Sequence, residues 1–253
     1  MPEPKSQTPD GAQNGPQSGP ESDPNAIKDR LLDAALVHVP FDGWSEATLR
    51  AAATDTGVDQ ALARALFPRA GVDLAMAYHR RGDAILAARL AAEELGHLRI
   101  RDRIATAIRY RIEAIEDREA VRRGATLFAL PQHAADGARA VWGTADRIWT
   151  AMGDTSNDLN WYTKRTLLAG VYGSSVLFWL GDDSAGHQAT WNFVDRRIED
   201  VMRFEKLKAS VNRSPLLRPL MIGPNWLARQ VRAPKRTPPA DLPGVWNGQP
   251  QEQ

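Results

Sequence analysis

Apolar residues recur at helical spacing along most of this 253-residue chain. One stripe consists of Ile104, Ile108, Ile112 and Ile115, and charged residues occupy the other faces of the same segment. Alanine, leucine and arginine are frequent and β-branched residues are sparse, which favours helices throughout. The pattern therefore predicts an all-α fold. The predicted helices cover residues 26–39, 45–54, 59–66, 72–81, 83–95, 100–120, 131–152, 154–182 and 189–211.

The segment 154–182 is predicted to be one helix with two different halves. In the first half, one helical face holds Asp158, Trp161, Tyr162 and Arg165, at positions i, i+3, i+4 and i+7. Two large rings between an acid and a guanidinium are the mixture favoured at the centre of protein interfaces. The same spacing also fits two core rings, with Asp158 near the helix start and Arg165 in solvent. Both interpretations stay open at this point.

The second half of this segment, residues 167–180, is apolar and rich in small residues, which let a helix or an apolar ligand approach the backbone. At about 14 residues it is too short to cross a bilayer, which needs about 20. Residues 131–152 add a second apolar face with large rings. The two segments either line an apolar cavity or form a plain core with large side chains. The candidate residues for binding an apolar ligand in such a cavity are Trp142, Trp149, Leu168, Val171, Tyr172, Ser175, Phe178 and Trp179.

Two short predicted helices, 45–54 and 59–66, are joined by a turn that contains glycine, as in a helix-turn-helix. Between positions 26 and 81 there are seven basic and seven acidic residues, so this module carries no net charge. Phosphate neutralisation supplies most of the non-specific affinity for DNA. Asp59 would also face phosphates at the front of the second helix. A module without net charge is a poor candidate for DNA binding, so DNA binding is kept only as the alternative hypothesis.

Candidate chemistry is sparse in this chain. Glu94 and His97 show the Glu-x-x-His spacing of helical di-iron sites, but such sites need a second pair, and the sequence has none. It also has no nucleophile elbow, phosphate loop or dinucleotide fingerprint. The absence of cysteine excludes disulfides and thiolate chemistry. We therefore expect no catalytic residues, no metal and no cofactor.

The two ends of the chain differ from the helical middle. Residues 1–24 are rich in Pro, Gly, Gln and Ser and resemble neither a secretory signal nor a transit peptide, so we expect a disordered lead. Residues 213–236 contain six bases and no acid among aliphatic residues, a composition typical of a membrane interface. The alternative is a tail that packs on the domain. The candidate membrane residues are Leu216, Leu217, Leu220, Met221, Trp226, Arg218 and Arg229.

These features predict a division of the chain into five parts. A helix-turn-helix-like module (25–82) follows the disordered lead, and a second helical domain (83–212) comes next. The membrane-associating tail (213–236) and a disordered end (237–253) complete the chain. With a net charge of +1 and no targeting segment, we expect a bacterial cytoplasmic protein that is peripheral on the inner face of the membrane.

Several stretches carry a resemblance to a known family. They are DGWSEATLRAA, ALFPRAGVDLAMAYHRRGD, TSNDLNWYTKRTLLAGVYGSSVLFWLGDDS and TWNFVDRRIEDVM. Over about residues 27–211 the chain resembles the COQ9 family of lipid-binding accessory proteins in ubiquinone biosynthesis, and NWYTKR is the most specific segment. The resemblance implies a TetR-like helical bundle with a helix-turn-helix-like module at its N-terminus.

The resemblance also implies partners. Members bind an isoprenoid lipid or quinone precursor and present it to the di-iron demethoxyubiquinone hydroxylase, or its counterpart, at the membrane. The resemblance thus implies that residues 83–212 form a lipid-binding and dimerisation domain and that the candidate cavity residues are its lipid-binding residues. The family's partner-binding pattern falls on Asp158, Trp161, Tyr162 and Arg165, with Leu159 close by. TetR-like proteins pair through their last two helices, so a homodimer is expected. The alternatives are a TetR-like regulator that senses an apolar effector and a dimeric scaffold without ligand.

Overall fold

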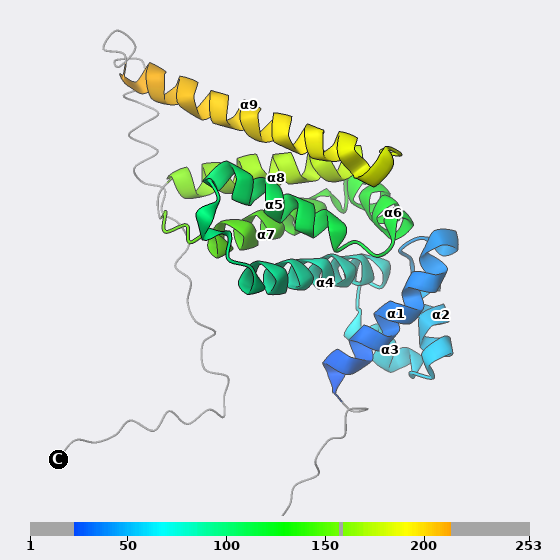
Figure 1. Ribbon diagram of the computed structural model, residues 1–253. Helices are drawn as coiled ribbons and strands as arrows, with labels where there is room; N and C mark the ends of the chain where they lie inside the picture. The colour runs from blue at the N-terminus through cyan, green and yellow to red at the C-terminus, as the bar shows by residue number, and fades with distance from the viewer. Residues whose placement is uncertain (1–22, 157–158, 214–253) are drawn as a thin grey trace, which may run out of the picture. The chain divides into compact units, whose positions relative to one another are not determined.

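The computed structural model describes residues 23–156 and 159–213, with the backbone alone for Leu159 and residues 204–213. Every regular element in these ranges is a helix, so the all-α prediction is confirmed (Figure 1). The α-helices are α1 (Pro24–Asp42), α2 (Glu46–Thr56), α3 (Gln60–Leu66), α4 (Gly71–Ala92), α5 (Ile100–Glu113), α6 (Arg118–Ala129), α7 (Ala134–Ala151), α8 (Leu159–Trp179) and α9 (Gln188–Arg213). Two short 3-10 turns, η2 (Leu95–His97) and η3 (Ala185–His187), precede α5 and α9.

In the structure, side-chain caps stabilise the starts of α2 and α3. The backbone N–H of Thr48 donates to Ser45 Oγ at 3.2 Å, so Ser45 caps α2. The Asp59 carboxylate accepts from the N–H groups of Ala61 and Leu62 at 2.9 and 3.1 Å and caps α3. In both cases a short polar side chain satisfies N–H groups that the first turn leaves without a helical partner.

The predicted end of the first helix at Val39 is wrong, because α1 continues through Pro40 to Asp42. Pro40 has no N–H to donate to the carbonyl of Leu36, but it lies in the last turn, so the helix ends two residues later. The helix stops at Gly43, whose φ of 64° lies in the region that favours glycine and whose N–H donates to the Val39 carbonyl at 2.9 Å.

The predicted break near residue 82 is also wrong, because α4 is one helix from Gly71 to Ala92. Gly82 has another role in the middle of this helix. A β-carbon at this position would lie 2.5 Å from Nη1 of Arg111, so the missing side chain makes room for that guanidinium. Gly82 therefore lets the Arg111 guanidinium approach the backbone of α4 and does not end the helix.

The single helix predicted over 100–120 is two helices in the structure. α5 ends at Glu113, and Asp117 starts α6 by accepting the N–H of Ala120 at 3.0 Å. Ile115 lies in the connection, outside the apolar stripe assigned to it. The helix predicted from Pro131 begins at Ala134.

The central helix is shorter than the predicted 154–182. α7 ends at Ala151 and is followed by Gly153, whose φ is 77°, and the N–H of Asp154 donates to the Trp149 carbonyl at 3.0 Å. This is the glycine-type end of a helix. Residues 154–156 therefore form a connection, and the described part of α8 covers Leu159–Trp179.

The chain forms two compact units, and three helices contribute residues to both. Unit one holds the described residues up to Ala88 together with Tyr110–Ala140. Its core joins α1, α2 and α3 around Leu31, Leu49 and Phe67. Trp44 is buried in this core and donates its indole N–H to the Ala120 carbonyl at 2.9 Å.

Unit two holds Arg89–Arg109 and the described residues from Val141 on. Within it, α8 and α9 lie side by side (Figure 1). Phe178 of α8 stacks on Phe193 of α9, with ring centroids 4.5 Å apart. In the ranges that the structure covers, no helix combines the length and the apolar character that crossing a bilayer requires.

Candidate functional site

Three large rings gather on unit two where α7 meets the start of α8. The Trp142 ring of α7 lies 6.0 Å from the Trp161 ring and 6.2 Å from the Tyr162 ring, both on α8. Trp161 and Tyr162 meet edge to face at 4.8 Å. All three side chains are partly exposed. We call Trp142, Trp161 and Tyr162 the ring cluster.

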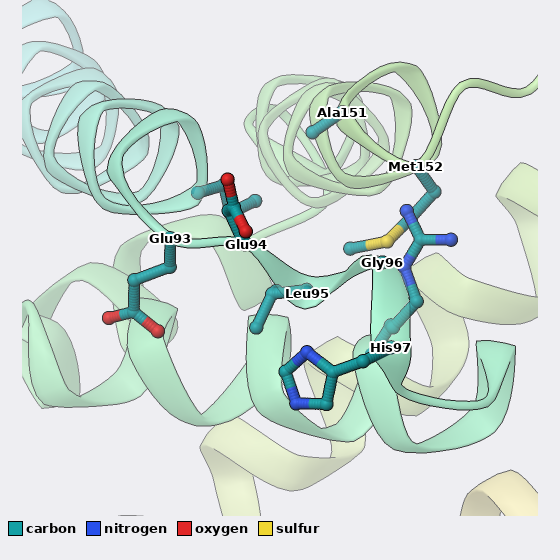
Figure 2. A pocket seen from close by; sticks show the side chains of 9 residues that line it. Glu93, Glu94, Leu95, Gly96, His97, Ala151 and Met152 are labelled. Atoms are coloured by element: carbon teal, nitrogen blue, oxygen red, sulfur yellow. The ribbon is translucent and has the colours of Figure 1, made fainter.

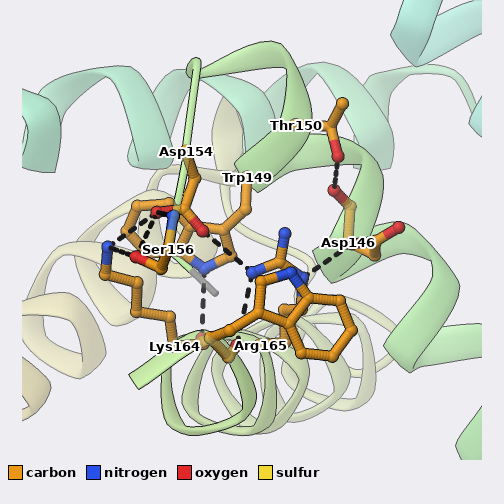
Figure 3. Close-up of polar contacts among 8 residues, drawn as sticks. Asp146, Trp149, Thr150, Asp154, Ser156, Lys164 and Arg165 are labelled. Carbon is orange, nitrogen blue, oxygen red and sulfur yellow. Dashed lines mark hydrogen bonds and ion pairs between the residues drawn. The ribbon is translucent and has the colours of Figure 1, made fainter. Parts of the chain in front are cut away.

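A buried ion-pair network lies beside these rings (Figure 3). Its centre is Arg165, which is only 1% exposed. Arg165 Nε donates to Asp146 Oδ1 at 2.6 Å, and Nη1 donates to Asp154 Oδ2 at 2.9 Å. The guanidinium therefore connects α7, the α7–α8 connection and α8. Arginine suits this task because its planar fork can donate to two carboxylates at once.

The network reaches the ring cluster through Trp161. The guanidinium carbon of Arg165 lies 4.1 Å from the centroid of the Trp161 ring, a cation–π distance. Arg165 Nη1 also donates to the Trp161 carbonyl at 3.2 Å. One side chain thus holds both the ring and the backbone of Trp161.

Asp154 holds the connection between α7 and α8 in place. Its carboxylate accepts from Lys164 Nζ at 2.7 Å and from Ser156 Oγ at 2.8 Å, in addition to Arg165. The Trp149 indole N–H donates to the Lys164 carbonyl at 3.1 Å. The aromatic face consequently rests on a connection fixed by several polar contacts.

Electrostatics keeps the two buried aspartates of unit two ionised. Burial by itself raises the pKa of Asp154, but hydrogen bonds from Lys164, Arg165 and Ser156 outweigh it and hold the pKa well below its ordinary value. Hydrogen bonds from Ser184 and Thr190 likewise lower the pKa of Asp182, which lies between α8 and α9.

These lowered pKa values predict acid sensitivity. A carboxylate whose folded pKa lies below its unfolded pKa stabilises the fold above the unfolded pKa, and this stabilisation is lost as the pH falls through the folded pKa. We expect the melting temperature to fall as the pH is lowered below about 4. Asp154→Asn is expected to lower the melting temperature at pH 7. Near pH 2 the melting temperatures of the variant and of wild type are expected to approach each other.

Differential scanning calorimetry from pH 7 to pH 2 measures this effect. Asp195→Asn, at an exposed position of α9, is the control for loss of one negative charge. A difference between Asp154→Asn and wild type that stays constant over the whole pH range would contradict the assigned role of the carboxylate.

The predicted partner-binding residues differ in their exposure in the structure. Trp161 and Tyr162 share a partly exposed face, as their spacing predicts. Arg165 is buried, so the alternative that left it in solvent is wrong. Leu159 begins α8, and Asp158 lies outside the described residues. The partner-binding role itself stays a prediction.

Sequence reasoning missed Asp146, Asp154 and Lys164 as members of this site, and it assigned Trp142 to a lipid cavity. A signal for Asp146 existed, because it precedes Trp149 by three positions and therefore shares a face of α7 with it. No comparable signal joins Trp142 to Trp161, since the two rings meet only after α7 and α8 pack together.

The predicted lipid-binding residues differ in their exposure. Leu168, Val171, Tyr172, Ser175 and Trp179 are buried along α8, and the Ser175 hydroxyl donates to the Val171 carbonyl at 2.7 Å. Phe178 is 36% exposed and stacks on Phe193, and Trp149 is partly buried beside Lys164. Lipid binding by these residues stays a prediction.

A pocket of about 400 Å³ lies elsewhere in unit two (Figure 2). Its lining residues are Leu90, Glu93, Glu94, Leu95, Gly96, His97, Arg103, Ala151 and Met152, and none is a predicted lipid-binding residue. Charged side chains make this pocket unlike the expected apolar cavity. Of the candidate di-iron pair, Glu94 precedes the 3-10 turn η2 and His97 is its last residue, so the two do not share one face of an α-helix.

The predicted membrane residues, from Leu216 to Arg229, lie outside the described residues, as does most of the predicted disordered lead. Their roles stay predictions. Within the described ranges, no group of three or more His, Asp or Glu side chains is arranged to hold a metal ion.

Comparison with known proteins places this architecture. The family model COQ9 matches residues 134–205, the stretch that contains the ring cluster and its ion-pair network. The "Ubiquinone biosynthesis protein COQ9, mitochondrial" of Rattus norvegicus is 32% identical over 187 residues, which cover 70% of this chain and 59% of the relative. The protein of the same name from Drosophila melanogaster is 30% identical and covers 72% and 57%.

The chain thus spans less than two thirds of the length of these relatives. Among solved structures, a TetR transcriptional regulator from Nitrosomonas europaea superposes with a TM-score of 0.55 at 20% identity, over 68% of this chain and 96% of the regulator. At this identity the likeness concerns the fold alone, and it agrees with the predicted TetR-like bundle. The chain is similar to COQ9 ubiquinone biosynthesis proteins over the matched residues, and its described part has a TetR-like, all-helical fold.

Proposed function

We propose that this chain is a non-catalytic accessory protein of ubiquinone biosynthesis. It binds an isoprenoid lipid or quinone precursor and presents it to the di-iron demethoxyubiquinone hydroxylase at a membrane surface. The relatives' names place them in ubiquinone biosynthesis. The chemistry belongs to the hydroxylase in this proposal, and the accessory chain supplies binding and orientation.

The observation that carries the proposal is the ring cluster on its buried ion-pair network. Large rings that are partly exposed and held rigidly offer much contact area, and they lose little conformational freedom when a partner binds. Tryptophan, tyrosine and arginine are also the residues that most often dominate protein interfaces. A protein partner is therefore the ligand that this surface fits best.

The lipid part of the proposal rests on α8. A β-carbon added at Gly170 would have no neighbouring atom within 4 Å beyond its own stretch of helix. A β-carbon added at Gly173 would lie near Val141 Cγ1 alone, at 3.9 Å. Helical glycines weaken a helix, and close packing does not require them here. An apolar chain that lies along these positions would account for them. Burying each methylene of such a chain contributes about 0.8 kcal/mol.

Native mass spectrometry with lipid extraction tests lipid binding. The comparison is between the full-length chain and a variant that ends at Arg213. A co-purified isoprenoid or quinone in the full-length protein supports the carrier role, and its loss in the shorter variant assigns a role to the tail. A protein without lipid contradicts the carrier role. The same spectra report whether the chain is a dimer.

The ring cluster predicts a large effect on partner binding. Trp161→Ala is expected to weaken binding to the purified hydroxylase of the same organism by at least about 30-fold, or about 2 kcal/mol. The reason is the loss of the ring at the centre of the cluster. Isothermal titration calorimetry measures the affinity. Trp191→Ala is the matched control, because Trp191 is a partly exposed tryptophan of the same unit, outside the ring cluster. Equal affinities for wild type and Trp161→Ala would exclude this surface as the docking site.

The regulator alternative has one structural argument against it. Asp59 caps α3, so a carboxylate lies at the end of the helix that would enter the major groove. DNA phosphates would meet this negative charge. A promoter fragment bound with a steep dependence on salt concentration would nevertheless favour the regulator.

A further inference from the structure

Arg165 directs its polar contacts inward. It is 1% exposed, and its hydrogen bonds to Asp146, Asp154 and the Trp161 carbonyl are all within the chain. Asp154 is 4% exposed, and Asp146 is 32% exposed. A protein that docks on the ring cluster would therefore meet Trp161 before it could reach the guanidinium.

We infer that Arg165 is a positioning residue for partner binding: it holds the Trp161 ring in its docking orientation and does not itself touch the partner. This inference rests on the proposed function. It assigns Arg165 a different role from Trp161 and Tyr162, although all three belong to one sequence pattern. It also gives Asp146 and Asp154 a role, because they fix the guanidinium against the ring.

The physical basis is preorganisation. A partly exposed tryptophan that is free to change rotamer loses this freedom when a partner binds, which weakens affinity by about three- to tenfold. The Arg165 guanidinium, 4.1 Å from the ring centroid, reduces that freedom before binding. A lysine keeps the positive charge, but its compact ammonium cannot bridge two carboxylates and also lie flat against the ring.

Fluorine NMR of the full chain labelled with 5-fluorotryptophan reports the ring orientation directly. The eight tryptophans give eight signals, and Trp161→Phe assigns the one of interest. Arg165→Lys is expected to shift or broaden the Trp161 signal and to leave the Trp44 signal of unit one unchanged, which shows that the chain is folded. Asp146→Asn is the second variant if Arg165→Lys does not fold, with the same expected change at Trp161.

Binding to the purified hydroxylase then separates positioning from direct contact. Arg165→Lys is expected to weaken binding by about three- to tenfold. The double variant Arg165→Lys/Trp161→Ala is expected to bind no more weakly than Trp161→Ala alone, because Arg165 acts through that ring. Arg197→Lys is the control, since Arg197 also lies over an aromatic ring, that of Phe193, and pairs with Asp200, but on α9. It is expected to bind as wild type does.

Two results would overturn the inference. Additive losses in the double variant would mean that Arg165 contacts the partner, and an unchanged Trp161 signal in Arg165→Lys would mean that it does not orient the ring. Failure of the proposed function looks different, since Trp161→Ala would then bind the hydroxylase as tightly as wild type. In that case the docking role of Arg165 is also excluded.

Discussion

Replacing Arg165 by methionine is expected to lower the free energy of unfolding by about 3–5 kcal/mol, the usual effect of removing one partner from a buried ion pair. Methionine fills a similar space but cannot donate to Asp146 or Asp154. Asp154, which is 4% exposed, would keep Lys164 and Ser156 and lose the guanidinium. Urea denaturation followed by tryptophan fluorescence measures the change.

Two further variants make the Arg165 result specific. Arg197→Met removes an exposed ion pair with Asp200 and is expected to lower the free energy of unfolding by less than about 1 kcal/mol. Arg165→Met combined with Asp154→Leu is expected to recover part of the loss, because a buried charge no longer lacks its partner. A loss below about 1 kcal/mol for Arg165→Met would show that the network does not stabilise unit two.

Asp83→Leu is expected to lower the free energy of unfolding by a similar amount, about 3–5 kcal/mol. In unit one, Arg111 Nε donates to Asp83 Oδ1 at 2.8 Å, and both side chains are almost completely buried. Without this carboxylate the buried guanidinium of Arg111 loses its ion pair with Asp83. Thermal unfolding followed by circular dichroism measures the effect.

Asp29→Leu is the matched control for Asp83→Leu. Asp29 lies 3.8 Å from Arg81, but its side chain is 74% exposed, so the expected loss is below about 1 kcal/mol. The double variant Asp83→Leu/Arg111→Met should be more stable than Asp83→Leu alone, since it also removes the buried guanidinium that paired with Asp83. If it is less stable, packing rather than charge explains the first result.

Each of the two units thus contains a buried arginine that pairs with one or more aspartates of another segment. Arg111 in unit one has Asp83, and Arg165 in unit two has Asp146 and Asp154. In unit one the pair lies beside Gly82, whose missing side chain makes room for it. In unit two the arginine also lies against a partly exposed ring. This contact with the ring cluster is why we assign a role in binding to Arg165.

The sequence by itself determined the features that depend on near neighbours in the chain. Helical spacing predicted the all-α class and the shared face of Trp161 and Tyr162, because residues three and four apart lie together on any α-helix. Ser45 marked the start of one helix, because a cap bonds to N–H groups two or three positions away. The NWYTKR segment carried the family resemblance.

Only the tertiary structure decided what meets each helical face. Helical spacing places Arg165 on the same side as Trp161, but the direction of a long side chain depends on whether another segment supplies carboxylates. Asp146 and Asp154 do so from α7 and the connection after it, and they draw the guanidinium inward. Trp142 likewise joins the ring cluster only because α7 packs against α8. Burial and pairing are properties of contacts between segments, and spacing within one segment does not encode them.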